Sequence, residues 1–420
     1  MNVPTHSGYK VEHQCPQCGA PVTLEEADRF FECRFCRVRS YIYQKSFFRY
    51  MFKPSERTPK DRNIIYIPYW RFKGSQFTCS IEKGVRHQFM DMSRLAIPEE
   101  IGPFPMSLGL RSQALPLKLV SGDTAGTFIA PLGFKKALAL MEAMLTAIKP
   151  KEPAVLRQYI GEARTLIFSP FYIEENRVFD AILNKPAGHA GPEILNAEKL
   201  GAFRPDQGTA FIAGICPSCG WDLHGSSDSL VLVCKNCDSM WRPKKDELVR
   251  VEFACAQTEP GDYIYMPFWC INADISGIPF CSYADLARIA NLPRAILPEW
   301  ENRKFSFWAP AFKINPEIFL RLSRQFTVFQ PSPKLSRKIH GLELHPVTLP
   351  PREGLESIKI VMAVLVKPAR KWLPLLPETK VTPKKVRLVY MPFEKRHHDF
   401  FSPEMRISIA KNSLTAGTNL

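Results

Sequence analysis

The segment Cys15-Pro-Gln-Cys18-Gly19 decides the fold of the first part of the chain, together with Cys33-Arg-Phe-Cys36; fourteen residues separate Cys18 from Cys33. Each Cys-x-x-Cys pair folds as a knuckle, a tight turn with both sulfurs on one side, and Gly19 tolerates the backbone angles that follow. Phe30-Phe31-Glu32 is rich in β-formers and predicts a strand that runs into the second knuckle. Two knuckles joined by a short hairpin supply four thiolates to one tetrahedral ion, so a zinc ribbon is predicted here.

The same pattern occurs again in Cys216-Pro-Ser-Cys219-Gly220 and Cys234-Lys-Asn-Cys237, also with fourteen residues between the knuckles. A redox pair would need a βαβ context and disulfides an oxidising compartment, whereas iron is chemically possible for four thiolates. Because protein fills all four positions, each Zn²⁺ is expected to be structural rather than catalytic. The expected ligands of the two ions are Cys15, Cys18, Cys33, Cys36, Cys216, Cys219, Cys234 and Cys237.

A second signature also repeats behind each ribbon. Ile65-Tyr-Ile-Pro-Tyr-Trp70 follows the first ribbon and Ile264-Tyr-Met-Pro-Phe-Trp269 follows the second, and related segments close each half at Leu166–Tyr172 and Leu388–Phe393. Proline has no N–H for a sheet ladder, so each segment is predicted to place it at an edge, a bulge or a strand start. The flanking aromatic residues could stack on bases, but packing in a β-rich core is the favoured interpretation.

Few helices are predicted. The apolar spacing in Phe134–Ile148 indicates one, Pro316–Phe326 occupies a comparable place in the second half, and Ser282–Ile296 is a further candidate. We expect a β-rich α+β protein with two rubredoxin-like zinc ribbons, each followed by a mainly antiparallel β domain with one or two helices. The expected domains are ribbon 1 (1–45), β domain 1 (46–183), a linker (184–207), ribbon 2 (208–248), β domain 2 (249–412) and a C-terminal tail (413–420).

Composition indicates a folded protein of the cytoplasm. The hydrophobic fraction of 45% is ordinary for globular cores, and no run of about 18 uncharged apolar residues suggests a membrane-spanning helix. The N-terminus lacks the apolar core of a signal peptide. Eight of the twelve cysteines lie in metal-type pairs, which favours a reducing compartment. The others, Cys79, Cys255, Cys270 and Cys281, are expected to be free thiols, mostly buried.

The net charge of +15 is unevenly distributed. Residues 29–86 carry fourteen Lys or Arg against four acids, and residues 367–396 carry nine against two. Such clusters favour an anionic partner, although a solvated basic surface kept for solubility explains them equally well. Cations interleaved with aromatic residues in the first ribbon suit contact with phosphates and bases. The candidate contacts are Arg29, Arg34, Arg37, Arg39 and Phe35.

A zinc ribbon followed by Tyr-x-Pro-[Tyr/Phe]-Trp, at Cys15–Cys36 and Tyr66–Trp70, resembles bacterial proteins with a transcription-factor-IIB-type zinc ribbon. Several of these are of unassigned function or share their ribbon with the primosomal helicase, and some resemble parts of membrane-stress systems built around phage-shock-protein-A homologues. The chain departs from single-ribbon members because it is duplicated, and from membrane-bound members because it has no transmembrane segment. The resemblance implies a bacterial metal-binding protein and supplies no catalytic residue.

No established catalytic motif is present, and the nine histidines are scattered. His397-His398-Asp399 is interpreted as a solvated turn rather than an acid–base site. The leading hypothesis is therefore a non-enzymatic scaffold that binds a protein partner or larger assembly through rigid ribbons. Nucleic-acid binding by the first ribbon is the alternative, and peripheral association with an anionic membrane is a second alternative.

Overall fold

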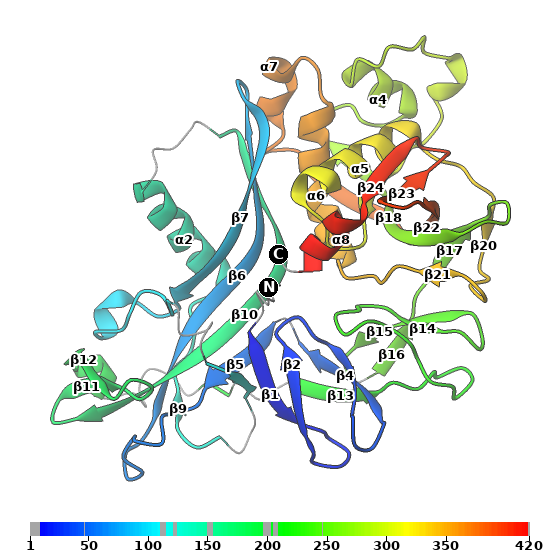
Figure 1. The fold of residues 1–420 in the computed structure, drawn as a ribbon. Coiled ribbons are helices and arrows are strands. Elements are labelled where there is room, and N and C mark those ends of the chain that lie inside the picture. Colours follow the sequence, from blue (N-terminus) through cyan, green and yellow to red (C-terminus); the bar gives the residue numbers. More distant parts are fainter. Residues whose placement is uncertain are drawn as a thin grey trace. The chain divides into compact units, whose positions relative to one another are not determined.

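The computed structural model describes residues 9–45, 47–109, 115–120, 124–148, 154–195, 203–204, 209–245 and 247–418. The chain divides into two compact units. The first comprises 1–73, 90–150 and 163–213, and the second comprises 74–89, 151–162 and 214–420. Strands dominate both units and helices are fewer, so the chain is a β-rich α+β protein, as expected (Figure 1). No helix within the described residues is long and apolar enough to cross a membrane.

The elements of residues 9–213 are β1 (Lys10–Gln14), β2 (Pro21–Glu25), β3 (Phe30–Glu32), β4 (Arg39–Gln44), β5 (Phe48–Phe52), β6 (Ile65–Ser80), β7 (Gly84–Leu95), η1 (Glu99–Ile101), β8 (Leu117–Leu119), β9 (Thr127–Phe128), α2 (Phe134–Ile148), β10 (Leu156–Glu174), β11 (Arg177–Asp180), β12 (Lys185–His189), α3 (Pro192–Leu195) and β13 (Thr209–Ala213). The predicted helix Phe134–Ile148 is confirmed as α2.

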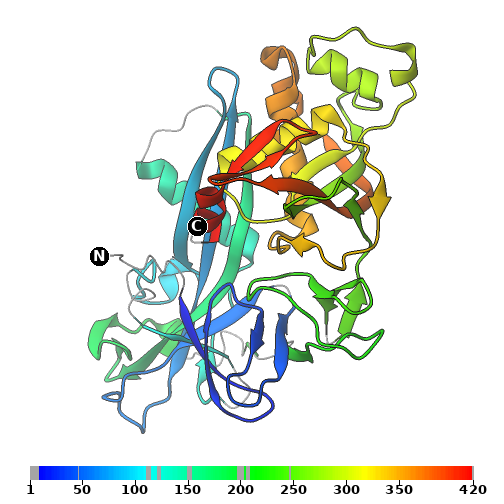
Figure 2. The same cartoon turned by 45° about the vertical axis from the view of Figure 1, so that its right-hand side comes forward.

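The elements of residues 214–418 are β14 (Leu232–Cys234), β15 (Ser239–Lys244), β16 (Glu247–Arg250), β17 (Phe253–Ala256), β18 (Tyr263–Ser276), α4 (Tyr283–Ile289), η3 (Pro298–Trp300), β19 (Phe307–Pro310), α5 (Pro316–Phe329), β20 (Leu335–Ser336), β21 (Glu343–Leu344), α6 (Pro351–Leu365), α7 (Ala369–Trp372), η4 (Leu373–Leu375), β22 (Lys380–Lys395), β23 (Asp399–Ser402), β24 (Ile407–Ala410) and α8 (Lys411–Thr418). Figure 2 shows the final strands β23 and β24 in red beside β22.

The two units use the same pairing pattern. In the first, β10 pairs with β5 in parallel and with β6, β5 pairs with β8 antiparallel, and β6 pairs with β9 in parallel. In the second, β22 pairs with β17 in parallel and with β18 antiparallel, β17 pairs with β20 antiparallel, and β18 pairs with β21 in parallel. Both sheets are therefore mixed, because long chain segments return to lie alongside β5 and β17 in parallel.

The prolines of the repeated signature lie inside the long strands β6, β10, β18 and β22, whereas the prediction was an edge, a bulge or a strand start. Pro267 is paired with Tyr390 of β22. On its other side it lies between the end of β21, opposite Tyr265, and the end of β19, opposite Phe268. This gap in the neighbouring strands explains how the missing N–H is tolerated. Pro267 still accepts a hydrogen bond from the Ala311 N–H at 2.9 Å, as Pro68 does from Ala96 at 2.9 Å.

The aromatic residues around these prolines pack in the core, which confirms the favoured interpretation. All of them are at most 6% exposed: Tyr66, Tyr69, Trp70, Phe168, Phe171, Tyr172, Tyr265, Phe268, Trp269, Tyr390 and Phe393. They are therefore unable to stack on bases from solvent.

Two tryptophans reveal which helices correspond between the units. The Trp70 indole donates to the carbonyl of Leu132 at 2.6 Å, and the Trp269 indole donates to that of Leu349 at 2.9 Å. Each acceptor lies two residues before a helix, α2 in the first unit and α6 in the second. The counterpart of α2 is thus α6, and the proposed match of Phe134–Ile148 with Pro316–Phe326 is wrong.

The segments expected to be a linker and a tail contain regular structure. The segment 184–207, expected as a linker, holds β12 and α3, while 196–202 and 205–207 lie outside the described residues. Helix α8 covers most of the expected tail 413–420. The candidate helix Ser282–Ile296 ends early, because α4 runs only from Tyr283 to Ile289 behind a capping box at Ser282.

Candidate metal centres

The first four-cysteine cluster is built by two knuckles joined by the segment that contains β2 and β3; β2 pairs with β1 and β3 pairs with β4, so the two strands do not form the expected hairpin. The Cys15 and Cys36 sulfurs lie 3.7 Å apart, as do those of Cys18 and Cys33. The Gly19 N–H donates to the Cys15 carbonyl at 2.9 Å, with φ of 73° at Gly19. This left-handed backbone closes the knuckle and turns both sulfurs to one side.

The second cluster has matching geometry. The Cys216 and Cys237 sulfurs are 3.6 Å apart, and those of Cys219 and Cys234 are 3.5 Å apart. Gly220 takes the same φ of 73°, and its N–H donates to the Cys216 carbonyl at 2.9 Å. Identical spacing in the sequence has therefore produced nearly identical knuckles.

The geometry of each cluster fits the binding of one metal ion. In each, the four ligand atoms lie within 4.8 Å of one another. A tetrahedron with metal–sulfur bonds of about 2.3 Å has edges of about 3.8 Å, close to the separations observed. A disulfide would need its sulfurs at about 2.05 Å, and all of these cysteines are free thiols. Four thiolates leave no ligand position for a substrate, so a bound ion would hold the two knuckles together.

Hydrogen bonds lower the pKa of Cys33 in the first cluster and of Cys216 and Cys219 in the second. The backbone amides of Cys36 and Phe35 lower the pKa of Cys33 to about 6. Burial raises the pKa of Cys216, but the Ser239 hydroxyl and nearby backbone amides outweigh it and lower the value to about 6. Thiolates are the form that binds metals.

Ser239 distinguishes the second cluster from the first. Its hydroxyl lies 3.0 Å from the Cys237 sulfur and 3.6 Å from the Cys216 sulfur, and it accepts the Trp241 indole N–H at 2.8 Å. Because the indole supplies a proton, the hydroxyl hydrogen is free to point at sulfur. The equivalent position of the first cluster, two residues after its last cysteine, is Val38, which offers no such donor.

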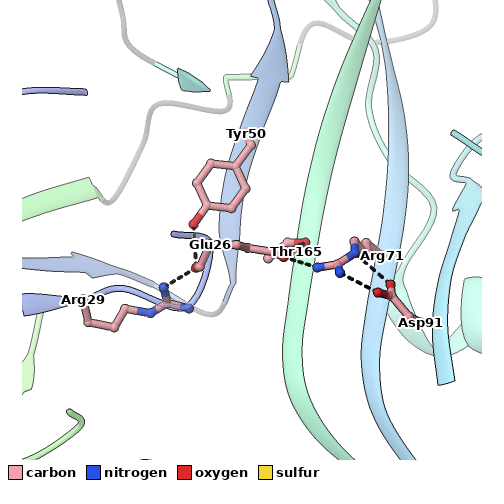
Figure 3. Close-up of polar contacts among 6 residues, drawn as sticks. All are labelled: Glu26, Arg29, Tyr50, Arg71, Asp91 and Thr165. Atoms are coloured by element: carbon pink, nitrogen blue, oxygen red, sulfur yellow. Dashed lines mark hydrogen bonds and ion pairs between the residues drawn. The ribbon is translucent and has the colours of Figure 1, made fainter. Parts of the chain in front are cut away.

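A buried ion pair anchors the first ribbon to its sheet. The Glu26 carboxylate lies between the guanidinium of Arg71 and the hydroxyl of Thr165, which donates to it at 2.7 Å (Figure 3). Asp91 binds the other side of the Arg71 guanidinium through contacts of 2.9 and 3.0 Å. The Arg71 side chain is fully buried and that of Glu26 is 4% exposed. Burial lowers the pKa of Arg71, but these carboxylates raise it by a larger amount, so the guanidinium stays charged.

The backbone of Glu26 is held as well. Its carbonyl accepts the Arg29 guanidinium at 2.7 Å and the Tyr50 hydroxyl at 3.1 Å (Figure 3). The Arg29 guanidinium also stacks over the Phe48 ring at 3.7 Å. Sequence reasoning missed this network, because Glu26 and Arg71 have no motif and only the folded chain brings them together.

The second ribbon is anchored by different groups at a comparable place. Asp228 follows the first knuckle by about as many residues as Glu26 does, and its carboxylate lies 3.4 Å from the Lys313 ammonium. Two residues further on, the Leu230 N–H donates to the Val347 carbonyl at 2.8 Å. After the last knuckle, Asp238 accepts the Ile339 N–H at 3.1 Å.

The structure separates the candidate anion contacts of the first ribbon into two groups. Arg29 is held internally by Glu26 and Phe48, and Arg39 pairs with Glu32 at 2.9 Å. Arg34 and Arg37 are exposed, and Phe35 between them is 69% exposed. Three of the five candidates therefore form one solvent-facing group at the second knuckle.

The second ribbon carries an exposed apolar pair that sequence reasoning missed. Ile215 is 51% exposed and Trp221 is 59% exposed, on either side of the first knuckle. The Cys216 N–H donates to the Trp221 carbonyl at 2.7 Å, which keeps the two flanks together. A tryptophan directly after Gly220, in a turn that exposes its side chain, was the available signal.

The four remaining cysteines are free thiols, as expected, but only Cys79 and Cys255 are buried. Burial raises the pKa of each of these two thiols to about 12. They behave as small apolar core residues rather than as nucleophiles.

Comparison of the chain with protein-family models, with curated proteins and with solved structures found no match. The function is therefore argued from the two metal centres and their surroundings.

Proposed function

We propose that the chain is a non-enzymatic zinc-ribbon protein that binds a protein partner through its ribbon knuckles. The metal centres are closed by four cysteines each, which suits a Zn²⁺ ion with a structural role. The observation that carries the proposal is the pair Ile215 and Trp221, which leaves large apolar side chains exposed on a turn that the metal would make rigid. Burial of such a side chain contributes about 1.5–3 kcal/mol, and tryptophan is enriched at binding hot spots.

A capture experiment with purified full-length chain tests this proposal. The double variant Ile215→Ser, Trp221→Ser is compared with wild type in native lysate, and Leu183→Ser, at a side chain that is 53% exposed, is the matched control. We expect a defined partner to be retained by wild type and the control and lost from the double variant. Equal capture by all three proteins, or capture by none, would contradict the proposal.

Nucleic-acid binding by the first ribbon is the second candidate function, favoured by the group formed by Arg34, Phe35 and Arg37. In the described part of the chain, no ion pair holds the two guanidinium groups, and Phe35 is exposed between them. Cations beside an aromatic ring suit phosphate contact with base stacking. Arg29 and Arg39 are already held by other residues of this chain, so the surface available to a nucleic acid is smaller than the sequence suggests.

Fluorescence anisotropy with a labelled single-stranded oligonucleotide tests the second candidate. Binding should weaken steeply as salt rises from 50 to 300 mM, because phosphate contacts release counterions. Arg34→Glu with Arg37→Glu should abolish binding and leave the metal content unchanged. Binding that is unchanged by added salt or by the double substitution would show that this surface does not contact the nucleic acid.

A further inference from the structure

A hollow of about 290 Å³ lies in the second unit where the C-terminal ends of α4, α5 and α6 meet. Seven of its eleven lining residues are apolar, and the lining comes from four separate parts of the chain. The apolar lining residues are Ala290, Leu292, Val328, Phe329, Val364, Leu365 and Met405. The hollow is far in sequence from the cysteine clusters, and nothing in the proposed function uses it.

Among the residues that the structure describes, three cations border this hollow and no carboxylate does. Arg294 follows α4, Arg324 lies in α5 and Lys367 follows α6, while Gln325 is the remaining polar residue of the lining. All three cationic side chains are exposed, and none has an ion-pair partner among the residues that the structure describes. Like charges around one hollow repel one another, and a bound anion would relieve that repulsion.

The helix ends do not account for these cations. A helix C-terminus carries about half a negative charge, so three helix ends offset at most about half of the three positive charges. Several terminal carbonyls also have other donors. The Tyr283 hydroxyl donates to the Val328 carbonyl at 2.8 Å, the Gln330 side chain to the Thr327 carbonyl at 2.6 Å, and the Lys367 N–H to the Ile289 carbonyl at 2.7 Å. The charged groups of Arg294, Arg324 and Lys367 are thus available to a ligand.

We propose that this hollow binds a small anionic amphiphile, a molecule with one carboxylate and a short apolar body. Guanidinium groups match a carboxylate in a two-point geometry, and apolar walls with a few placed polar groups are typical of ligand pockets. Taking the roughly 30 Å³ of a water molecule in the liquid as the size of one heavy atom, the hollow holds about ten such atoms. A medium-chain carboxylate has this size.

Isothermal titration of the full-length chain with octanoate tests the site. Ligands of this size that bind well have dissociation constants on the order of 0.1–1 mM. Octanol has the same chain without the charge and acetate has the charge without the chain, so each should bind at least about tenfold more weakly. Equal affinity for octanol would show that the cations take no part, and would overturn the proposal.

Variants locate the binding on this hollow. Arg294→Gln with Arg324→Gln should weaken octanoate at least about tenfold, because charged hydrogen bonds are lost from the pocket rim. Arg352→Gln is the control, since it removes an exposed arginine of α6 that does not line the hollow. All three side chains are exposed, so folding should survive, and circular dichroism verifies it. Unchanged affinity in the double variant would assign any binding to another place and refute the proposal.

Discussion

Glu26 places a carboxylate where water cannot reach it, and Arg71 is its buried partner. Removing one partner of such a pair leaves the other charge uncompensated, which typically costs 3–5 kcal/mol. Asp91 would still hold Arg71, so the loss should be at the lower end of that range. We expect Glu26→Gln to lower the free energy of unfolding by about 3 kcal/mol, measured by urea denaturation.

Glu12→Gln is the matched control for this change. Glu12 pairs with Lys53 at 2.8 Å, but both side chains are about half exposed, at 43% and 50%. Water screens such pairs, so the control should lose less than about 1 kcal/mol. Equal losses of unfolding free energy in the two variants would mean that burial does not make the Glu26–Arg71 pair more stabilising than an exposed pair.

Ser239 should make the second metal centre hold its ion more firmly. Hydrogen bonds to the ligands typically change metal affinity by about 10- to 100-fold. Ser239→Ala should therefore speed metal transfer to a chromogenic chelator from one centre only, by about tenfold. The first centre has Val38 at the equivalent position and serves as the internal control. Unchanged release from both centres would show that the hydroxyl does not act on the metal site.

At the scale of elements, His345 lies where the loop before β14 meets the sheet of the second unit. Its backbone N–H donates to the Tyr265 carbonyl at 2.9 Å, and its ring lies edge-on to Phe312 with centroids 5.0 Å apart. Burial lowers its pKa from 6.5 to about 4, and Asp228 opposes this shift only in part. The neutral ring is therefore the form that packs.

This shift predicts how stability depends on pH. The unfolded chain binds a proton near pH 6.5 and the folded chain only near pH 4, so the contribution is complete above pH 6.5 and is lost as pH falls toward 4. The loss is about 3 kcal/mol. Urea denaturation at both pH values should show it in wild type and not in His345→Gln. An identical pH dependence in the two proteins would contradict the assignment.

At the scale of the whole molecule, the two clusters predict the metal content. Protein purified without chelator should contain about two zinc ions per chain by elemental analysis. Cys33→Ser should leave about one ion and make the 15–36 region sensitive to protease, because metal binding and folding are coupled in such ribbons. Fewer than two ions in wild type, or another metal, would overturn the zinc assignment.

The two units share one pattern of strand pairing. Equivalent strands pair in the same order around β10 and β22, and the same indole-to-carbonyl hydrogen bond precedes α2 and α6. Pro68 and Pro267 accept equivalent backbone hydrogen bonds of 2.9 Å. The units differ in the groups that anchor their ribbons, Glu26 with Arg71 and Asp228 with Lys313.

The cysteine sets and the Pro-aromatic strands could be predicted because short-range spacing controls them. A knuckle needs only neighbouring residues to bring two sulfurs together. The long runs of apolar residues in the strands likewise predict that these strands are buried. Helix α2 was also predictable from its periodicity. Helix α6 was missed, since Pro350, Pro351 and Gly354 obscure a helix that starts with proline at its first position.

The sequence by itself therefore determined the two four-cysteine centres, the β-rich fold class and the burial of the aromatic residues. Only the tertiary structure decided that α6 matches α2 and that Glu26 binds Arg71. It alone showed that Arg29 and Arg39 are held by other residues of the same chain. It alone brought Arg294, Arg324 and Lys367 around one hollow. The physical reason is that these contacts join residues far apart in the chain, and their energies depend on burial and direction. Neither property can be read from residue type and spacing.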